Sequence, residues 1–350
     1  MSDIGAQHIG IRQLVAAVGT GPTNGRHLTR AEARAALEAI MDGAATPAQA
    51  GALLLLQRYR GESSDELLGY IDAARGRMRP LRPQVEGLLD VGSPYDGRGK
   101  HVVVSPAASI VAAAAGVPVL MHGEPDMGPK KGIAVGDVIA ALGVNTDAAP
   151  DAVARGIEAC GLGYVRQARL VPDLQAIKPL REELGLRTLI HTVEKIYDPA
   201  GAPYQLVGVA HMPYLKLMGP ALAQLGHRRT MVVQGMEGHE DVTTSRGARV
   251  IEIDDAGEHE WRLDPASLGL QPATEGDLAP GDAARSARFT LAVLDGSSTP
   301  SQRDLALLNA ALRVKLTDRA DDLPSALADA RDALASGAAM RRLEAWRRVG

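Results

Sequence analysis

Apolar positions in residues 1–80 recur with the spacing of amphipathic helices. Three of these segments begin with a capping box, in which a Ser or Thr is followed three residues later by Glu or Gln. The pairs are Thr29 with Glu32, Thr46 with Gln49, and Ser63 with Glu66. Glycine follows two of the segments, at Gly43 and Gly61, where helices commonly end. Together with a shorter helix around Ile11 to Val18, the pattern predicts a small helical unit.

The hydrophobic pattern changes at Leu88. From Leu88 to Gly143, short apolar runs alternate with glycine-rich turns and one run of small residues, which predicts a strand, a helix and a second strand. The order recurs where two β-branched runs, YQLVGVA and RRTMVVQG, flank the amphipathic segment MPYLKLMGPALAQLG. Such repeats imply parallel strands. The runs RVIEI and HEWRL predict one antiparallel pair, and the chain after Pro300 predicts two or three helices.

These elements define the expected fold class. It is α/β, with a small N-terminal helical domain and a large α/β domain built on a mainly parallel central sheet. Loops at the carboxyl ends of neighbouring parallel strands form a natural ligand crevice. The loops that follow the first two predicted strands, beginning near Gly92 and His122, are therefore the candidate site.

Composition narrows the class of protein. The chain has 350 residues, a formal net charge of −4 and one cysteine, Cys160, so an intramolecular disulfide and a cysteine-based zinc site are excluded. The amino terminus lacks a signal pattern and no apolar run approaches the length of a membrane span, so we expect a cytoplasmic protein without a membrane partner. The net charge does not imply attraction to nucleic acid, although basic residues are prominent between Arg166 and Lys216.

Three ordered segments carry motifs of a known family. They are LGLRTLIHTVEKIYDPAGAP, VVQGMEGHEDV and RDLALLNAALRVKL. The first resembles the stretch LGxRTxFNxLGPLxNPA, and the second VVHGxDGLDEI, of anthranilate phosphoribosyltransferase (TrpD) in glycosyl transferase family 3. The resemblance implies a helical domain over residues 1–80, joined by a later helical pair near 172–186, and an α/β domain over residues 81–350. It also implies a homodimer formed through the helical domain.

The first candidate loop departs from the family pattern. The family binds phosphoribosyl pyrophosphate on a GTGGD loop, whose glycines let backbone amides approach the pyrophosphate. The matching residues here are Gly92, Ser93, Pro94, Tyr95 and Asp96. Proline removes an amide donor, and Tyr95 adds bulk where a phosphate would lie. Of the following NIST motif Ser105 remains, and a helix N-cap also explains that serine. The loop therefore argues against the family's mode of pyrophosphate binding.

The second candidate loop is KHGN in the family, followed by serines and a lysine that hold phosphate. Its residues here are Met121, His122, Gly123 and Glu124. Met121 replaces a cation, and Glu124 would place a carboxylate against an anionic ligand, which is costly in a partly desolvated pocket. His122 and Gly123 are retained, although a lone His after a strand is more often structural than catalytic. Lys130 and Lys131 follow, as phosphate ligands or as a solvated loop tip.

Two further positions match the family with changes. Arg181 corresponds to an arginine that contacts anthranilate, but Lys195 replaces the Pro of GPL and His191 replaces the preceding Asn. Glu240 and Asp241 correspond to the family's magnesium-binding pair in reversed order. Adjacent carboxylates can hold Mg²⁺ when substrate phosphates and water complete its shell, but they are also common on acidic loops. We therefore expect Mg²⁺ only if the chain is an active enzyme, and the sequence assigns no catalytic residue.

The combined departures resemble the YbiB-type paralogues of TrpD. That resemblance implies a dimer that binds DNA with little sequence preference and lacks anthranilate phosphoribosyltransferase activity. Contacts to phosphates alone give binding without sequence preference. The candidate nucleic-acid contacts are Lys130, Lys131, Arg166, Arg169, Arg187 and Lys195. The residues left from a degenerate phosphoribosyl pyrophosphate site are Gly92, Ser93, Asp96, Ser105, His122 and Gly123.

Three alternatives to nucleic-acid binding remain open. The chain is a Mg²⁺-dependent phosphoribosyltransferase acting on anthranilate, which the altered loops disfavour, or on a different acceptor. It is a nucleoside phosphorylase, which would need the missing Lys and Ser phosphate ligands. Or the basic residues pair with the acidic segment 237–282 and bind nothing.

Overall fold

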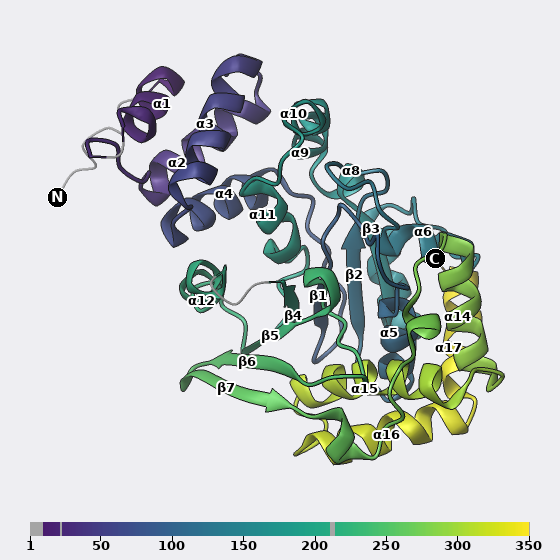
Figure 1. Cartoon of the computed structure of the whole chain (residues 1–350). Coiled ribbons are helices and arrows are strands. Elements are labelled where there is room, and N and C mark those ends of the chain that lie inside the picture. Colours follow the sequence, from purple (N-terminus) through teal and green to yellow (C-terminus); the bar gives the residue numbers. More distant parts are fainter. Residues whose placement is uncertain (1–9, 22, 211–213, 350) are drawn as a thin grey trace.

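A computed structural model describes residues 10–21, 23–210 and 214–349. Figure 1 shows a helical unit, purple to blue, beside a larger α/β domain that carries the sheet. The predicted fold class is confirmed: a small N-terminal helical domain accompanies a mostly parallel seven-stranded sheet. No helix in the described ranges is both long and apolar enough to span a bilayer.

The helical unit forms where the capping pattern predicts it. Its helices are α1 (Ile11–Gly19), α2 (Arg30–Met41), α3 (Pro47–Arg60) and α4 (Ser64–Arg77). The hydroxyls of Thr29, Thr46 and Ser63 each accept from the amide three residues on, and the Glu or Gln side chain at that position returns the bond. These reciprocal bonds satisfy the otherwise unpaired amides at each helix start.

The α/β domain is organised around one sheet with the strand order β3-β2-β1-β4-β5-β6-β7. The strands are β1 (Leu89–Gly92), β2 (Val119–Gly123), β3 (Leu162–Arg166), β4 (Tyr204–Val209), β5 (Arg229–Gln234), β6 (Ala248–Asp254) and β7 (Gly257–Leu263). The first five run parallel, and β6 and β7 add the predicted antiparallel pair. The carboxyl ends of the parallel strands therefore meet at one edge.

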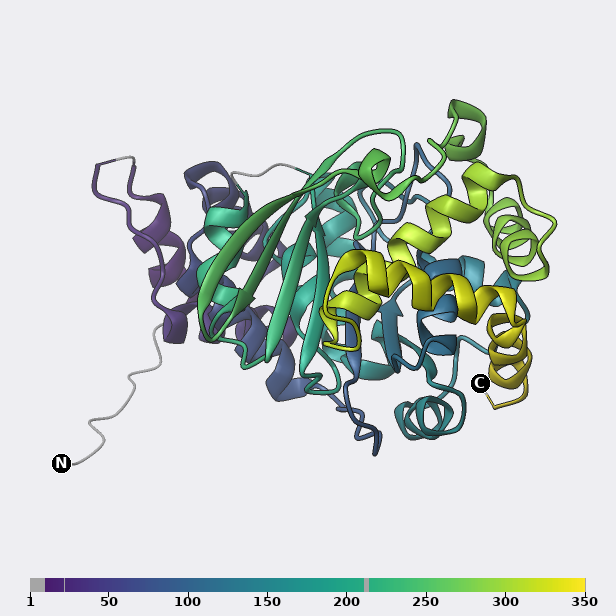
Figure 2. The ribbon, with the colours of Figure 1, turned by 90° about the horizontal axis from the view of Figure 1, so that it is seen from below.

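Helices cover both faces of the sheet, and the two layers come from different parts of the chain. Side chains such as Val207 and Val232 pack with the helical unit and with α11 (Ile190–Ile196) and α12 (Leu215–Leu222). Their strand neighbours Leu206 and Met231 point to the opposite face, where most of the remaining helices pack. These are α5 (Ser105–Ala114), α6 (Val135–Ala141), α7 (Pro150–Cys160), α14 (Ala283–Asp295), α15 (Pro300–Leu316), α16 (Leu323–Ala335) and α17 (Ala338–Val349). Figure 2 shows the sheet between the amino-terminal and carboxyl-terminal helices.

Short elements complete the chain. They are α8 (Gln167–Leu170), α9 (Pro172–Ala176), α10 (Lys178–Leu184), η2 (Met236–Gly238), η3 (Pro265–Leu268) and α13 (Glu275–Leu278). α9 packs against α2 and α10 against α3, so this later segment lies beside the helical unit. The helix expected over MPYLKLMGPALAQLG is present as α12, and residues 211–213 of that segment lie outside the described residues.

Ser105 differs from its expected role as a helix cap. α5 begins at Ser105 itself, with Val104 in the cap position, and Val104 supplies no side-chain acceptor. The Ser105 hydroxyl instead accepts a hydrogen bond of 2.9 Å from Arg313 on α15. A tertiary partner far along the chain decides the orientation of this hydroxyl, and local sequence does not reveal such a partner.

Candidate functional site

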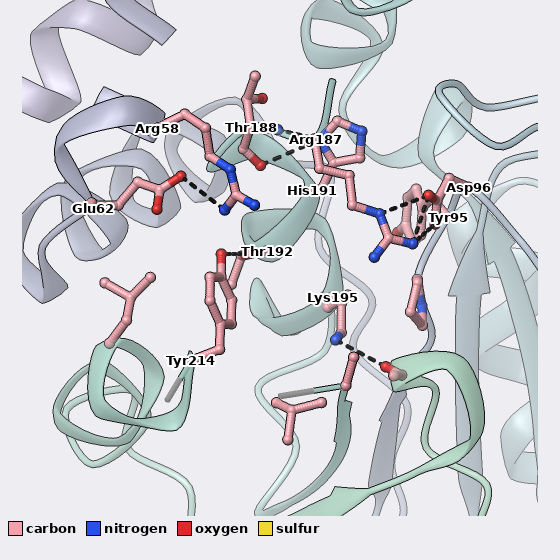
Figure 3. Close-up of a pocket in the computed structure, with 16 residues that line it drawn as sticks. Arg58, Glu62, Tyr95, Asp96, Arg187, Thr188, His191, Thr192, Lys195 and Tyr214 are labelled. Atoms are coloured by element: carbon pink, nitrogen blue, oxygen red, sulfur yellow. Dashed lines mark hydrogen bonds and ion pairs between the residues drawn. The ribbon is translucent and has the colours of Figure 1, made fainter. Parts of the chain in front are cut away.

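A cavity of about 440 Å³ lies between the helical unit and the carboxyl edge of the sheet. Its walls come from the α3–α4 connection, the loops after β1 and β5, the end of β4, α11 and the start of α12. The Arg, Lys, His, Asp and Glu side chains that line it are Arg58, Glu62, Asp96, Arg187, His191 and Lys195 (Figure 3). This is the edge at which open α/β sheets bind ligands.

The first candidate loop forms one wall of the cavity. A Cβ at Gly92 would lie 2.0 Å from the carbonyl oxygen of Lys195, so glycine is needed for α11 to pack this close to β1. Asp96 accepts from Arg187 at 2.8 and 2.9 Å, which ties the loop to the segment before α11. In the part of the chain that the structure describes, the amides of Tyr95 and Asp96 donate to no acceptor. Two backbone donors therefore remain in this loop.

Tyr95 contributes less bulk to the cavity than its position in the motif suggests. Its side chain is 3% exposed, and its hydroxyl lies 2.6 Å from both His122 Nδ1 and the Tyr197 hydroxyl. His122 is itself buried, with Nε2 3.2 Å from Asp90 Oδ1. Most of the phenol is therefore packed in the interior. His122 has a polar neighbour at each ring nitrogen, as expected for a structural histidine.

The second candidate loop turns its altered residues away from the cavity. Met121 is buried on the sheet face that packs against α5 and α15, within the second hydrophobic cluster. Glu124 is buried too, and its carboxylate accepts from Arg166 Nε at 3.0 Å and from the Ala168 amide at 2.9 Å. Neither residue lines the cavity. The expected repulsion between Glu124 and an anionic ligand therefore does not arise there.

Lys195 is the most unusual cation of the cavity. It is 9% exposed, and its ammonium donates to the carbonyl oxygens of Gly208 and Gly238. Burial lowers its pKa to about 8, and the positive charge of Arg187 acts in the same direction. The other two cavity cations have carboxylate partners: Arg187 pairs with Asp96, and Arg58 lies 3.7 Å from Glu62.

Arg181 lies outside the cavity wall. Its guanidinium is 1% exposed and donates to the carboxylate of Glu194, which is fully buried on α11. Burial raises the pKa of Glu194, and Arg181 opposes that shift. His191 lies one turn before Lys195, with Nε2 3.1 Å from the Gly128 carbonyl oxygen, and burial lowers its pKa to about 3. His191 is therefore neutral at physiological pH.

Glu240 and Asp241 form what we call the closed cluster, together with Arg98 and Arg313. Arg98 Nη2 lies 2.5 Å from Asp241 Oδ2 and 3.6 Å from Glu240 Oε1, and Arg313 Nη2 lies 3.3 Å from Asp241 Oδ1. All four side chains are 0% exposed. Ser93 donates to Glu240 Oε1 at 2.6 Å.

This arrangement does not fit a magnesium site. Both oxygens of Asp241 already accept from guanidinium groups, and Glu240 Oε2 is the one carboxylate oxygen of the pair without a partner. Mg²⁺ requires several accessible oxygen ligands and its own water molecules, whereas these side chains are fully buried. No group of three or more His, Cys, Asp or Glu side chains suited to a metal occurs within residues 10–21, 23–210 and 214–349.

The four remaining candidate nucleic-acid residues are all paired within the chain. Lys130 lies 3.5 Å from Glu237, Lys131 lies 3.0 Å from Glu182, Arg166 pairs with Glu124, and Arg169 pairs with Asp147. Only Lys130 has its partner in the acidic segment 237–282; the other partners come from loops and helices close in space. A basic face free to meet a phosphate backbone is therefore not assembled from these residues.

The helical unit supplies cavity residues that sequence reasoning missed. Arg58 and Glu62 lie at the end of α3 and just after it, and Tyr214 precedes α12. The Tyr214 hydroxyl bonds to Thr192 on α11, as Figure 3 shows. The spacing of Arg58 and Glu62, four residues apart, is the one local signal of a pair, and it does not indicate which surface the pair faces.

Comparison with known proteins identifies relatives along almost the whole chain. Residues 95–340 match the glycosyl transferase family a/b domain, and residues 14–78 match the helical bundle domain of the same family. Anthranilate phosphoribosyltransferase from Rhizobium meliloti (strain 1021) is 38% identical over 318 residues, covering 91% of this chain and 93% of the relative. The protein of the same name from Anaeromyxobacter sp. (strain K) is 38% identical over 334 residues, covering 95% and 96%.

Solved structures agree with the sequence relatives. The crystal structure of anthranilate phosphoribosyltransferase (TrpD) from Thermus thermophilus has a TM-score of 0.83 and 30% identity, covering 97% of this chain and 98% of that chain. Anthranilate phosphoribosyltransferase from Saccharomyces cerevisiae in complex with PRPP and Mg has a TM-score of 0.85, covering 97% of each chain. At 17% identity, the yeast likeness shows the fold alone.

These relatives correct two predictions. The predicted nucleic-acid-binding function is wrong, and so is the predicted DNA partner, because the similar proteins are anthranilate phosphoribosyltransferases. The finer resemblance to YbiB-type paralogues is likewise not supported. The prediction of nucleic-acid binding rested on substitutions in the family's phosphate-binding motifs and on the presence of basic residues near the predicted crevice. The side chains of Tyr95 and Glu124 point elsewhere than that argument assumed, and most of the basic residues are internally paired.

Proposed function

The chain belongs to the glycosyl transferase family that combines a helical bundle domain with an α/β domain, and on that premise we propose that it is a phosphoribosyltransferase. The donor is phosphoribosyl pyrophosphate. The acceptor is an aromatic amine that carries a carboxylate, with anthranilate as the first candidate. Relatives with that activity in their names, 38% identical over nine-tenths of the chain, support the donor and the acceptor class together.

The observation that carries the proposal is the cationic cavity at the carboxyl edge of the sheet. Arg187 and Lys195 lie in its wall and offer charged donors to anionic groups, and Tyr95 and Asp96, whose amides have no acceptor among the described residues, line the same cavity. Val209, Leu217 and the Tyr214 ring supply an apolar wall suited to an aromatic acceptor. Its volume of about 440 Å³ lies within the range of small-molecule sites.

The proposed reaction is a substitution at the anomeric carbon. The acceptor nitrogen forms a bond to C1 of the phosphoribosyl group, and the bond from C1 to the pyrophosphate oxygen breaks with its electron pair. Pyrophosphate departs, and the acceptor nitrogen loses a proton to the solution. Arg187, held by Asp96, offsets negative charge on the departing pyrophosphate, while the walls exclude water from C1.

Magnesium has no place on the closed cluster in this proposal, because Arg98 and Arg313 already neutralise Glu240 and Asp241. A Mg²⁺ requirement of the reaction would come from the pyrophosphate of the substrate. The requirement for Mg²⁺ is tested by measuring how the rate depends on Mg²⁺ concentration at fixed concentrations of phosphoribosyl pyrophosphate.

The activity assay mixes purified protein with phosphoribosyl pyrophosphate and anthranilate, and follows anthranilate fluorescence and pyrophosphate release together. We expect stoichiometric loss of fluorescence and gain of pyrophosphate. Arg187→Met should lower kcat/KM by at least about tenfold, since charge-assisted bonds contribute roughly 1.5–3 kcal/mol. Glu275→Gln, on α13 outside the cavity, is the matched charge-changing control and should be active.

Two outcomes separate the parts of the proposal. Pyrophosphate release with another aromatic amine, but none with anthranilate, would retain the reaction and change the acceptor. Absence of pyrophosphate release with every amine tested, from protein that gives one cooperative unfolding transition, would contradict the proposed function.

A further inference from the structure

We infer that Lys195, and not Arg181, binds an anionic oxygen of the substrate in this chain. The anion is a carboxylate or a phosphate, since both offer the charged oxygen that a buried ammonium requires. The inference rests on the proposed function, which names the two molecules that could supply this oxygen. One is the aromatic amine, through its carboxylate, and the other is phosphoribosyl pyrophosphate, through its phosphates. It assigns the role to a residue that stands where the family motif has proline.

Arg181 is not placed to bind an anion in the cavity, because it is buried outside the cavity wall and paired with a carboxylate of the chain, although its Nε and Nη2 have no hydrogen-bond partner among the described residues. Glu194 binds the guanidinium, and both side chains are at most 1% exposed. Arg181 is absent from the cavity wall. An incoming carboxylate would have to displace Glu194 and leave it unpaired in the interior, which is strongly unfavourable.

Lys195 is in the opposite situation. An ammonium has three N–H donors, and the described residues engage this one through two carbonyl oxygens, those of Gly208 and Gly238. No carboxylate oxygen of the described residues forms an ion pair with its Nζ. Figure 3 shows Lys195 among the side chains that line the cavity, and Gly238, which accepts from its ammonium, lines the cavity too.

Burying the Lys195 ammonium without a paired carboxylate costs solvation free energy, and a bound anion would offset that cost. Moving an ammonium out of water without a counter-ion is expensive, and two carbonyl dipoles replace only part of its hydration. Of the three cavity cations, Arg58 and Arg187 each form an ion pair with a carboxylate, whereas Lys195 forms none with the described residues and feels Glu240 and Asp96 only at longer range. The binding free energy that an anionic substrate oxygen contributes is therefore expected to be largest at Lys195.

The neighbourhood of Lys195 suits either source of the anion. The first loop lies on one side, with Tyr95 and Asp96 in the cavity wall, and the phosphates of the donor would bind there. Thr192 and Tyr214 lie on the other side, with the apolar wall that suits the acceptor ring. Binding measurements with separate probes distinguish the two sources.

The experiment is calorimetric titration of the purified chain with anthranilate, phosphoribosyl pyrophosphate and inorganic pyrophosphate, each alone. We expect Lys195→Met to weaken at least one of them tenfold or more. Lys195→Arg keeps the charge and should retain part of the affinity. 2-Aminobenzamide, which lacks the carboxylate, serves as the neutral probe and should bind wild type and Lys195→Met equally. If anthranilate is the ligand affected, the anion is the acceptor carboxylate; if the phosphates are affected, it is the donor.

The matched comparison is the double variant Arg181→Met/Glu194→Gln, which removes both charges of the buried pair. We expect it to bind the same probes within twofold of wild type. Lys195→Met should fold, because it removes a buried charge, and a thermal melt checks this for both variants. Equal binding of every anion by wild type and Lys195→Met would overturn the inference, and so would loss of binding in the double variant alone.

The outcomes also separate this inference from the proposed function. Anion binding that depends on Lys195, in a chain that releases no pyrophosphate, would support the inference and contradict the transferase. If the chain is an active transferase and its Lys195→Met variant keeps the wild-type KM and affinities, the proposed function is supported and the inference about Lys195 is contradicted. A wild-type chain that binds none of the three anions overturns the inference.

Discussion

The carboxyl edge of the sheet holds two groups of buried charge that are organised differently. In the closed cluster, the guanidiniums of Arg98 and Arg313 meet the carboxylates of Glu240 and Asp241, and no side chain of the four is exposed. In the cavity, Lys195 is nearly as buried, but its described partners are two carbonyl oxygens.

This difference in pairing shows that buried charged residues of similar type can have different roles. Opposite charges that pair inside the chain and are closed off from solvent cannot reach a ligand, even though Arg98 Nε and Nη1 have no hydrogen-bond partner among the described residues. A charge that the chain leaves partly satisfied, beside an accessible cavity, is a binding group. The acidic pair that the family motif suggested as a metal site belongs to the first kind, and the lysine that replaced the motif proline belongs to the second.

The largest expected effect comes from opening the closed cluster. Arg98→Met leaves Glu240 and Asp241 short of a positive charge in the interior, and we expect the free energy of unfolding to fall by about 3–5 kcal/mol. Denaturant titration measures the change. Asp241→Asn added to Arg98→Met removes one of the uncompensated charges and should recover part of the stability. A loss below about 1 kcal/mol in Arg98→Met would show that the cluster contributes little.

The second effect concerns the pH dependence of anion binding. The pKa of Lys195, about 8, is lowered by burial, Arg187 and Lys130, and is raised by Glu240 and Asp96. The ammonium is mostly protonated at pH 7 and mostly neutral at pH 9, so anthranilate affinity should fall by up to about tenfold over that interval. Calorimetry at each pH measures it, with phosphoribosyl pyrophosphate titrated in the same way in case the donor supplies the anion. Lys195→Arg should give a flat profile, and a flat wild-type profile with both ligands would contradict a role for the lysine charge.

The smallest effect is expected at a surface pair. Arg169 and Asp147 are each about half exposed, at 47% and 52%, and water screens their attraction. Arg169→Ala should change the free energy of unfolding by less than about 1 kcal/mol. The same denaturant titration serves for comparison with Arg98→Met. A loss at Arg169 as large as that at Arg98 would remove the distinction between closed and exposed pairs.

Local sequence predicted those parts of the fold that depend on neighbours in the chain. The capping boxes at Thr29, Thr46 and Ser63 need partners three residues away, so their spacing was sufficient. The parallel strands followed from buried β-branched runs separated by helices. The loop positions at the carboxyl edge followed from the same pattern.

The candidate site was harder to predict because its properties depend on contacts between distant segments. The motif letters place Tyr95 and Glu124 at ligand positions, but their side chains are directed by Tyr197 and Arg166. Arg98 neutralises the acidic pair from a position 142 residues earlier than Glu240 and 143 earlier than Asp241. No local pattern reveals such a partner.

The most direct measurement is a pair of crystal structures, one of the chain with phosphoribosyl pyrophosphate and Mn²⁺ and one with anthranilate alone, with Mn²⁺ located by its anomalous scattering. The predicted result is an anionic oxygen of one substrate within hydrogen-bond distance of Lys195 Nζ, with the Arg98–Asp241 contact of 2.5 Å retained and no manganese bound to Glu240 or Asp241. Manganese coordinated by these two carboxylates, with Arg98 displaced and no anion at Lys195, would contradict the account.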